Sequence, residues 1–206
     1  VYGLGMSEKL LSEALGSKRH DVLISTKFGV SWDENPVNGK AKTFYDSSPK
    51  RVFEAVEGSL KRLRIDSIPL YYVHWPDQNT PFSDTAEALK RCQESGKIQN
   101  IGLSNFTISQ IKEINQYLNI SAVQSQYSLI DREIEGNFLN TCNKLGINVF
   151  TYGPLAQGLL TGKYNDQSIF DDNDCRQRLP HFHGEKYNHH LGVIQQVSEI
   201  ANKYEV

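Results

Sequence analysis

Short apolar segments alternate along the chain with longer segments of helical periodicity. The short segments are rich in β-branched and aromatic residues, which is typical of strands, and they cover residues 22–28, 70–75, 98–104, 122–128 and 148–154. The longer segments predict helices at residues 7–16, 49–63, 83–95, 107–117, 133–145 and 189–204. Strands separated by helices of this length indicate βαβ units and a parallel sheet.

The predicted helix at 49–63 has the clearest start. Ser48 can cap its first turn, and Pro49 suits the first helical position because its missing N–H would have no partner there. Four apolar residues then recur on one helical face, namely Val52, Val56, Leu60 and Leu63. This face predicts the side of the helix that packs on the sheet.

The alternation continues from residue 1 to residue 206 without a composition break, which predicts a single α/β domain. Two architectures fit the pattern, an open doubly wound sheet and a (β/α)₈ TIM barrel. No G-x-G-x-x-G motif follows a predicted strand, so the dinucleotide fingerprint of the open-sheet class is missing. The segment at 153–164 also fails as a phosphate-binding P-loop, because Tyr164 stands where that motif needs Ser or Thr.

Composition and charge exclude several classes of protein. The chain is 38% hydrophobic and 22% charged, with a formal net charge of -2 and no long run of one charge. A nucleic-acid binder or a membrane-surface protein would show a concentrated basic face. No apolar run reaches the roughly 18 residues of a membrane span, and no signal peptide is visible, so we expect neither.

The cysteines and histidines do not predict a disulfide framework or a metal site. Cys92, Cys142 and Cys175 are widely spaced and odd in number, as expected for free thiols in a reducing cytosol, and we therefore expect a cytoplasmic protein. Four histidines gather near the C-terminus without a cysteine or carboxylate at ligand spacing, namely His181, His183, His189 and His190. We expect no metal there.

Polar residues stand at the ends of five successive predicted strands. The active site of a parallel barrel is built at these carboxyl ends. The residues are Lys27, His74, the pair Ser104 and Asn105, Gln124 with Gln126, and Tyr152. A single lysine at a strand end is usually a solvated side chain, and a single histidine is usually a core residue. Their repetition at five strand ends indicates a functional site.

Carbonyl reduction is the chemistry that suits these residue types. The reduced carbonyl needs a proton donor at its oxygen, and a phenol can serve if a nearby ammonium group lowers its pKa. An imidazole beside the same oxygen can orient and polarise the carbonyl. Ser104, Asn105 and Gln124 carry donors and acceptors that can hold a carboxamide, and Tyr152 offers a flat face on which a nicotinamide can stack.

Six segments resemble successive signatures of the aldo-keto reductases. They are YGLGMSEKLLSEAL, STKFG, YYVHWPD, GKIQNIGLSNF, AVQSQYSLIDRE and YGPLAQGLLTGKY, in this order along the chain. The fourth segment, GKIQNIGLSNF, is the most specific of the six for this family. The resemblance extends from Tyr2 through RLPHFHGEKYN at 178–188 and is nearest to the bacterial-type and channel β-subunit-like branches.

The resemblance implies a (β/α)₈ barrel that binds NADP(H) in an extended conformation without a Rossmann domain. It also implies a catalytic tetrad of Asp, Tyr, Lys and His. In this sequence Tyr2 would be the general acid, Lys27 would lower its pKa, and His74 would orient the substrate carbonyl. Trp32 and Trp75 are candidates for the substrate pocket.

The same resemblance assigns the cofactor-binding residues. Ser104, Asn105 and Gln124 would hold the carboxamide, and Tyr152 would stack on the nicotinamide. The segment 153–163 would line the pyrophosphate, through Gly153, Pro154, Leu155, Gln157, Gly158 and Lys163.

Two departures from the family pattern indicate part of a longer chain. The family places the tetrad aspartate just before the tyrosine, and only one residue precedes Tyr2 here. The family also places its 2′-phosphate contacts in a last strand and loop, which would lie beyond residue 206. We therefore expect an incomplete barrel, in which the first strands and the last strand are missing. A smaller departure is Pro69, where the family often has aspartate, and proline is tolerated at the start of a strand.

Three functions fit the resemblance. The leading one is an NADPH-dependent reductase of a small aldehyde or ketone. The second is a regulatory subunit that keeps the fold and the nucleotide pocket but serves to bind a protein partner. The third is a truncated and inactive relative. Turnover of simple aldehydes distinguishes the first from the other two.

Overall fold

The computed structural model describes residues 2–33 and 42–205, which form two compact units. The first, here called the sheet unit, contains residues 1–125 and 136–150. The second, here called the C-terminal unit, contains residues 126–135 and 151–206. A single barrel domain over 1–206 stays a prediction.

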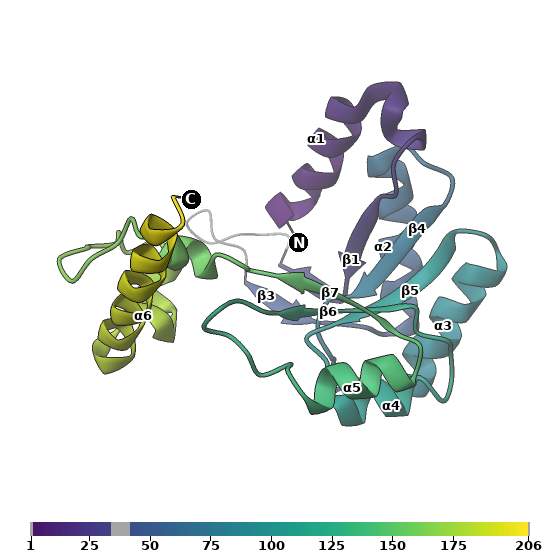
Figure 1. The fold of residues 1–206 in the computed structure, drawn as a ribbon. Helices are drawn as coiled ribbons and strands as arrows, with labels where there is room; N and C mark the ends of the chain where they lie inside the picture. Colours follow the sequence, from purple (N-terminus) through teal and green to yellow (C-terminus); the bar gives the residue numbers. More distant parts are fainter. Residues whose placement is uncertain (1, 34–41, 206) are drawn as a thin grey trace. The chain divides into compact units, whose positions relative to one another are not determined.

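The predicted parallel sheet is confirmed. Its strands are β1 (Ser25–Phe28), β4 (Ile68–Val73), β5 (Ile98–Ser104), β6 (Ala122–Gln126) and β7 (Asn148–Tyr152), in the order β1-β4-β5-β6-β7 (Figure 1). The pairs β1–β4, β4–β5 and β5–β6 are parallel. Sequential strands are therefore neighbours, as they are in a barrel.

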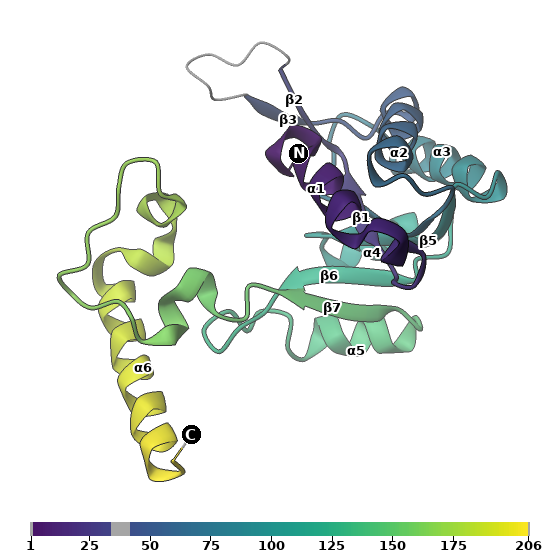
Figure 2. The ribbon, with the colours of Figure 1, turned by 90° about the horizontal axis from the view of Figure 1, so that it is seen from above.

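One helix precedes β1, and four others lie between successive strands of the sheet. They are α1 (Met6–Leu15), α2 (Pro49–Leu63), α3 (Phe82–Glu94), α4 (Ile108–Ile114) and α5 (Asn137–Lys144). Along the outside of the sheet α1 contacts α2, α2 contacts α3, and α3 contacts α4 (Figures 1 and 2). The hydroxyl of Ser48 accepts a hydrogen bond from the N–H of Arg51 at 3.4 Å, which confirms the predicted cap of α2.

Several boundaries differ from the prediction. The strand predicted at 22–28 begins only at Ser25, where pairing with β4 begins, and Leu23 is 88% exposed. A small antiparallel sheet of β2 (Val30–Trp32) and β3 (Thr43–Tyr45) was missed. Short 3₁₀ helices also occur: η1 (Tyr2–Gly5), η2 (Gly16–His20), η3 (Ala156–Thr161), η4 (Cys175–Arg178) and η5 (Pro180–Phe182).

The core of the sheet unit is built from its central strands and the helices that pack beside them. Its largest fully buried side chains come from β4, β5, α2, α3 and α4 and from the segment before β6, and include Tyr71, Tyr72, Leu63, Ile68, Leu89, Ile98, Ile101, Leu103, Ile111, Ile114 and Ile120. Gly102 on β5 lets the ring of Tyr72 on β4 lie against its backbone. The strands that hold the candidate site are thus anchored by this core.

The C-terminal unit has a core of its own. The helix α6 (Gly184–Lys203, yellow in Figure 2) packs on η5 and begins five residues earlier than predicted. The buried members of this core are Ala156, Leu159, Phe182, Tyr187 and Ile194. Within the described ranges, α6 and the other helices are too short or too polar to span a bilayer.

Candidate active site

Tyr2, Lys27 and His74 come together in the sheet unit. The hydroxyl of Tyr2 lies 3.2 Å from Nε2 of His74, and the Nζ of Lys27 lies 5.4 Å from the centre of the Tyr2 ring. Tyr2 begins η1, Lys27 lies on β1, and His74 follows β4 directly. Because Phe28 pairs with Val73 in parallel register, the ends of β1 and β4 lie level, so the lysine and the histidine reach the same edge of the sheet.

Partial burial changes the protonation behaviour of all three groups. It raises the pKa of the Tyr2 phenol and lowers the pKa of Lys27. Burial, followed by the positive charge of Lys27, lowers the pKa of His74 from 6.5 to about 4. His74 is therefore neutral at pH 7, and Tyr2 keeps its proton. The lowering of the Tyr2 pKa implied by the resemblance stays a proposal.

Hydrogen bonds join four neighbouring strand ends into one frame, here called the strand-end frame. The N–H of His74 donates to the carbonyl of Phe28 at 2.8 Å. The side-chain amide of Asn105 donates to the carbonyl of His74 at 3.0 Å, and the N–H of Asn105 donates to the carbonyl of Gln124 at 3.2 Å. Asn105 has a left-handed φ of 64°, a conformation that asparagine tolerates better than most residues. The strand-end frame fixes the spacing of the site residues.

Glu8 ties the tyrosine-bearing segment to the strand that carries Lys27. Its carboxylate accepts hydrogen bonds from the Thr26 hydroxyl on β1 and from Nε of Arg62 on α2, each at 2.6 Å. Glu8 lies on α1, which follows η1 directly. Ser12 adds a second tie, because its buried hydroxyl donates to the carbonyl of Leu63 at 2.8 Å. Sequence analysis missed these ties, although Glu8 lies in the first matched segment.

Asp77 holds the loop that follows His74. Its carboxylate accepts hydrogen bonds from the N–H groups of Ser47 and Asn79, both at 2.9 Å, and from the Thr80 hydroxyl at 2.8 Å. Burial alone would raise the pKa of Asp77, but these hydrogen bonds lower it below its ordinary value. The ionised carboxylate thus connects the turn before α2 to the loop after β4, and this connection also escaped sequence analysis.

The two candidate pocket tryptophans have different neighbours. Trp32 lines a cavity of about 210 Å³ together with Tyr2 and Lys27. The ring of Trp75 stacks on Tyr45 of β3, with centroids 6.1 Å apart. Tyr45 is an aromatic neighbour that sequence analysis missed, since β3 itself was not predicted.

The candidate cofactor residues are divided between the units. Ser104 and Gln124 are register partners at the ends of β5 and β6, and Asn105 follows directly, so the sheet unit brings these three together. Tyr152 and the segment 153–163 belong to the C-terminal unit. There the carbonyl of Tyr152 accepts a hydrogen bond from the N–H of Tyr127 at 3.1 Å.

One of the histidines near the C-terminus, His181, forms a polar pair. Nε2 of His181 lies 2.6 Å from the carboxylate of Asp131, and both residues are buried. The ring of His190 lies 5.0 Å from that of His181. Among the residues that the structure describes, no group of three or more His, Cys, Asp or Glu is placed to hold a metal.

Comparison with known proteins decides the family. The profile of the aldo/keto reductase family matches residues 1–206. The chain belongs to the aldo/keto reductase family. It is 36% identical over 203 residues to an aldo-keto reductase of Bacillus subtilis, covering 98% of this chain and 60% of that protein. It is 38% identical over 170 residues to an NADH-specific methylglyoxal reductase of Escherichia coli, covering 78% and 52%.

Solved structures of aldo-keto reductases confirm the fold. A glycerol dehydrogenase of Gluconobacter oxydans superposes with a TM-score of 0.91 at 34% identity, over 99% of this chain and 62% of that one. An aldo-keto reductase of Klebsiella pneumoniae in complex with NADPH gives a TM-score of 0.64 at 25% identity, over 79% and 52%. This chain spans between 52% and 62% of the length of these four relatives. The predicted incomplete (β/α)₈ barrel is therefore confirmed.

Proposed function

We propose that the protein containing this chain reduces a small aldehyde or ketone to an alcohol with NADPH. The observation that carries the proposal is the approach of the Tyr2 hydroxyl to Nε2 of His74 at 3.2 Å, with the ammonium of Lys27 beside the Tyr2 ring. The names of relatives support reduction, since they include reductases, and they divide on the cofactor: one is designated NADP(+) and another is NADH-specific.

Each of the three residues has a separate task in this reaction. Tyr2 donates a proton to the carbonyl oxygen, and its raised pKa keeps it protonated until then. His74 is neutral, so it can orient the same oxygen through a hydrogen bond without adding a charge. The positive charge of Lys27 favours the phenolate that remains after proton transfer, which lowers the barrier to that transfer.

The residues assigned to the cofactor have the chemistry that NADPH requires. When bound, NADPH supplies the hydride to the carbonyl carbon. In the sheet unit, Ser104, Asn105 and Gln124 offer donors and acceptors at adjoining strand ends for a carboxamide. In the C-terminal unit, Tyr152 offers a flat ring for the nicotinamide. The turn at 153–163 offers glycine-rich backbone and the cation of Lys163 for the pyrophosphate.

Small molecules are the partners that this proposal requires, namely the carbonyl compound and the nucleotide. It requires neither nucleic acid nor a membrane. Cys92, Cys142 and Cys175 are free thiols, which suits a reducing compartment, so we propose a cytoplasmic location.

Reduction of 4-nitrobenzaldehyde by the full-length protein tests the proposal. Tyr2→Phe should lower kcat by about 10²–10⁴-fold, the usual contribution of general acid catalysis, while the Kd for NADPH stays nearly unchanged. Lys27→Met should also remove activity. The matched control is Tyr117→Phe, since Tyr117 at 48% is about as exposed as Tyr2 at 54% but lies outside the site.

Unchanged turnover in Tyr2→Phe would contradict the assigned acid. A Lys27→Met variant that changes only substrate affinity would contradict the electrostatic role of Lys27. If the full-length protein binds NADPH but reduces no aldehyde, the regulatory-subunit function is favoured, and co-purification with a membrane protein would support it.

A further inference from the structure

The turn at 153–163 has an unusual backbone conformation at two residues that are not glycine. Ala156 and Gln157 have φ values of 46° and 54°, although residues with a Cβ avoid the left-handed region. Gly153, Gly158 and Gly162 also have positive φ values. Such a backbone persists only where the surrounding structure holds it in place.

Packing beneath the turn provides part of this support. Ala156 and Leu159 are fully buried in the core of the C-terminal unit. The hydroxyl of Thr161 donates to the carbonyl of Gly158 at 2.7 Å. The two buried side chains anchor the turn to the core, and the Thr161 hydrogen bond closes it at the surface.

Tyr164 supports the turn at Gly158. A Cβ placed on Gly158 would lie 3.2 Å from Cε of Lys163 and 3.5 Å from both Cε2 and the hydroxyl oxygen of Tyr164, so the tyrosine packs against the turn beside the lysine stem. Its ring also packs edge-on against Phe170 and Phe182, with centroids 5.2 Å and 5.7 Å away. The position of the Tyr164 ring therefore limits the positions that Gly158 can take.

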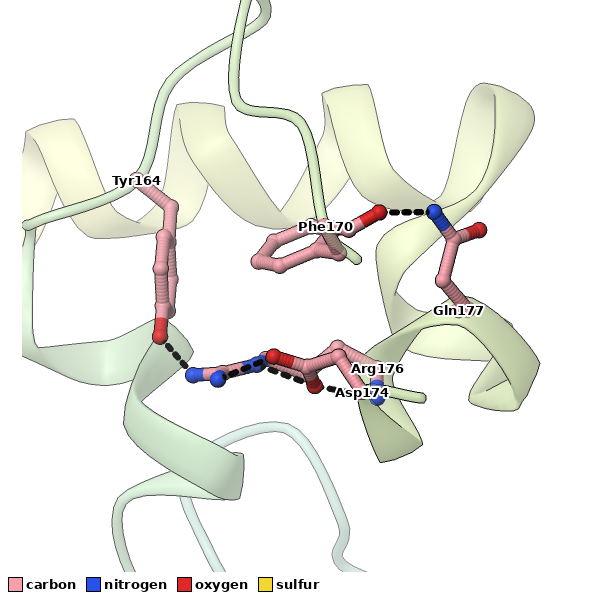
Figure 3. Close-up of polar contacts among 5 residues, drawn as sticks. All are labelled: Tyr164, Phe170, Asp174, Arg176 and Gln177. Carbon is pink, nitrogen blue, oxygen red and sulfur yellow. Dashed lines mark hydrogen bonds and ion pairs between the residues drawn. The ribbon is translucent and has the colours of Figure 1, made fainter. Parts of the chain in front are cut away.

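Arg176 in turn fixes the ring of Tyr164 (Figure 3). Its Nη1 donates to the Tyr164 hydroxyl, and its Nε donates to the carboxylate of Asp174 at 2.8 Å. The guanidinium carbon lies 5.3 Å from the centre of the Tyr164 ring and 5.2 Å from that of Phe170. We call Tyr164, Asp174 and Arg176 the Arg176 clamp.

The charged side chains of the clamp are mostly shielded from solvent. The side chains of Arg176 and Asp174 are only 26% and 20% exposed. Hydrogen bonds from Arg176 lower the pKa of Asp174 to about 2, so the pair stays charged across the physiological pH range. Gln177, the next residue, donates from its side chain to the main-chain carbonyl of Phe170 and so holds the backbone of the residue whose ring Arg176 covers (Figure 3).

We propose that the Arg176 clamp is a positioning device for the turn at 153–163 and thereby sets the affinity for the pyrophosphate of a dinucleotide. This inference rests on the proposed function, which assigns the turn to the cofactor. Arg176 and Asp174 act through Tyr164. A turn already held in its binding conformation loses less conformational freedom when the ligand binds. Loosening the clamp should weaken nucleotide binding and leave the chemical step at saturation unchanged.

Two mild substitutions in the full-length protein test the clamp. Arg176→Lys keeps the charge but loses the planar fork, and Tyr164→Phe keeps the ring but loses the hydroxyl. The matched control is Arg132→Lys, because Arg132 makes the same kind of two-bond contact to Glu135, at 2.8 Å each, within the same unit. Fluorescence titration gives the Kd for NADPH, and hydrogen exchange of the nucleotide-free protein reports on residues 153–163.

Both clamp variants should raise the Kd and the KM for NADPH by about fivefold or more, with kcat nearly unchanged. The reason is that the loosened turn at 153–163 would lose conformational freedom when NADPH binds. Both should also speed hydrogen exchange at 153–163 without a general increase elsewhere. Arg132→Lys should change neither quantity by more than about twofold.

Wild-type affinity together with wild-type exchange in both clamp variants would overturn the inference while leaving the proposed function intact. A uniform increase in exchange over the whole protein would overturn it too, because the clamp would then serve general stability. If the unmodified protein does not bind NADPH, the proposed function fails and the inference falls with it.

Discussion

Gly102 on β5 leaves room for the Tyr72 ring of the neighbouring strand β4. The Gly102→Ala substitution tests how little space remains between them. An added methyl group would lie 2.4 Å from both Cδ1 and Cε1 of Tyr72 and 3.2 Å from the carbonyl oxygen of Ala122. Real Cβ atoms do not tolerate the shorter distance. Tyr72 as a whole is only 2% exposed, so its ring has little room to move away.

The structure sets the size and the reach of this effect. Overpacking a close-packed core costs about 1–3 kcal/mol, and two ring atoms in direct overlap favour the upper half of that range. The Nζ of Lys27 lies 5.8 Å from the centre of the same Tyr72 ring. A displaced ring should therefore also disturb Lys27, and we expect kcat/KM to fall together with the free energy of unfolding.

Urea unfolding of the full-length protein measures the stability change. The control is Gly192→Ala on the exposed side of α6, where an added Cβ meets no atom within 4 Å. That change should stabilise the helix by about 0.5–1 kcal/mol, whereas Gly102→Ala should destabilise the protein. Equal stability of Gly102→Ala and the unmodified protein would refute the reasoning. So would an unchanged cost of Gly102→Ala in a Tyr72→Leu background, where the ring is absent.

Two further predictions concern the groups around Tyr2. Because the pKa of His74 falls from 6.5 to about 4 on folding, the unfolded chain binds a proton that the folded chain does not between these values. The free energy of unfolding should therefore decrease as the pH falls from 6.5 towards 4. In urea unfolding at a series of pH values, His74→Gln should reduce this dependence on pH, and an unchanged dependence would contradict the pKa shift. Glu8→Ala removes the carboxylate that binds Thr26 and Arg62 and should cost about 2 kcal/mol, more than Glu8→Gln; equal costs would show that its charge is unimportant.

Most of the fold could be predicted because strands and helices differ in their hydrophobic period. The exceptions have physical causes. The first turns of α6 are polar, and its buried face is built from Tyr187, His190 and Ile194, so the histidine interrupts an otherwise apolar pattern. The strands β2 and β3 contain three residues each, too few to show a period of two.

The candidate site could be predicted only where residues lie within local motifs. Lys27 and His74 stand at the ends of strands, so the topology alone places them at one edge of the sheet. The Asp131–His181 pair joins residues 50 positions apart, and the Glu8–Arg62 pair joins residues 54 apart. A single sequence holds no signal for such distant pairs, because each partner alone looks like an ordinary surface residue.

The strand-end frame has a consequence for how this protein can diverge. Its bonds use the main chain of Phe28, His74 and Gln124, and the side chain of only one residue, Asn105. Gene duplicates could therefore exchange the reactive side chains at positions 27 and 74 and keep the same scaffold, losing the reaction before losing the shape. Position 105 has no such freedom, since its left-handed backbone and its bridging amide both restrict replacement. In copies that lose the reaction, we therefore expect Asn105 to be kept after the residues at positions 27 and 74 have changed.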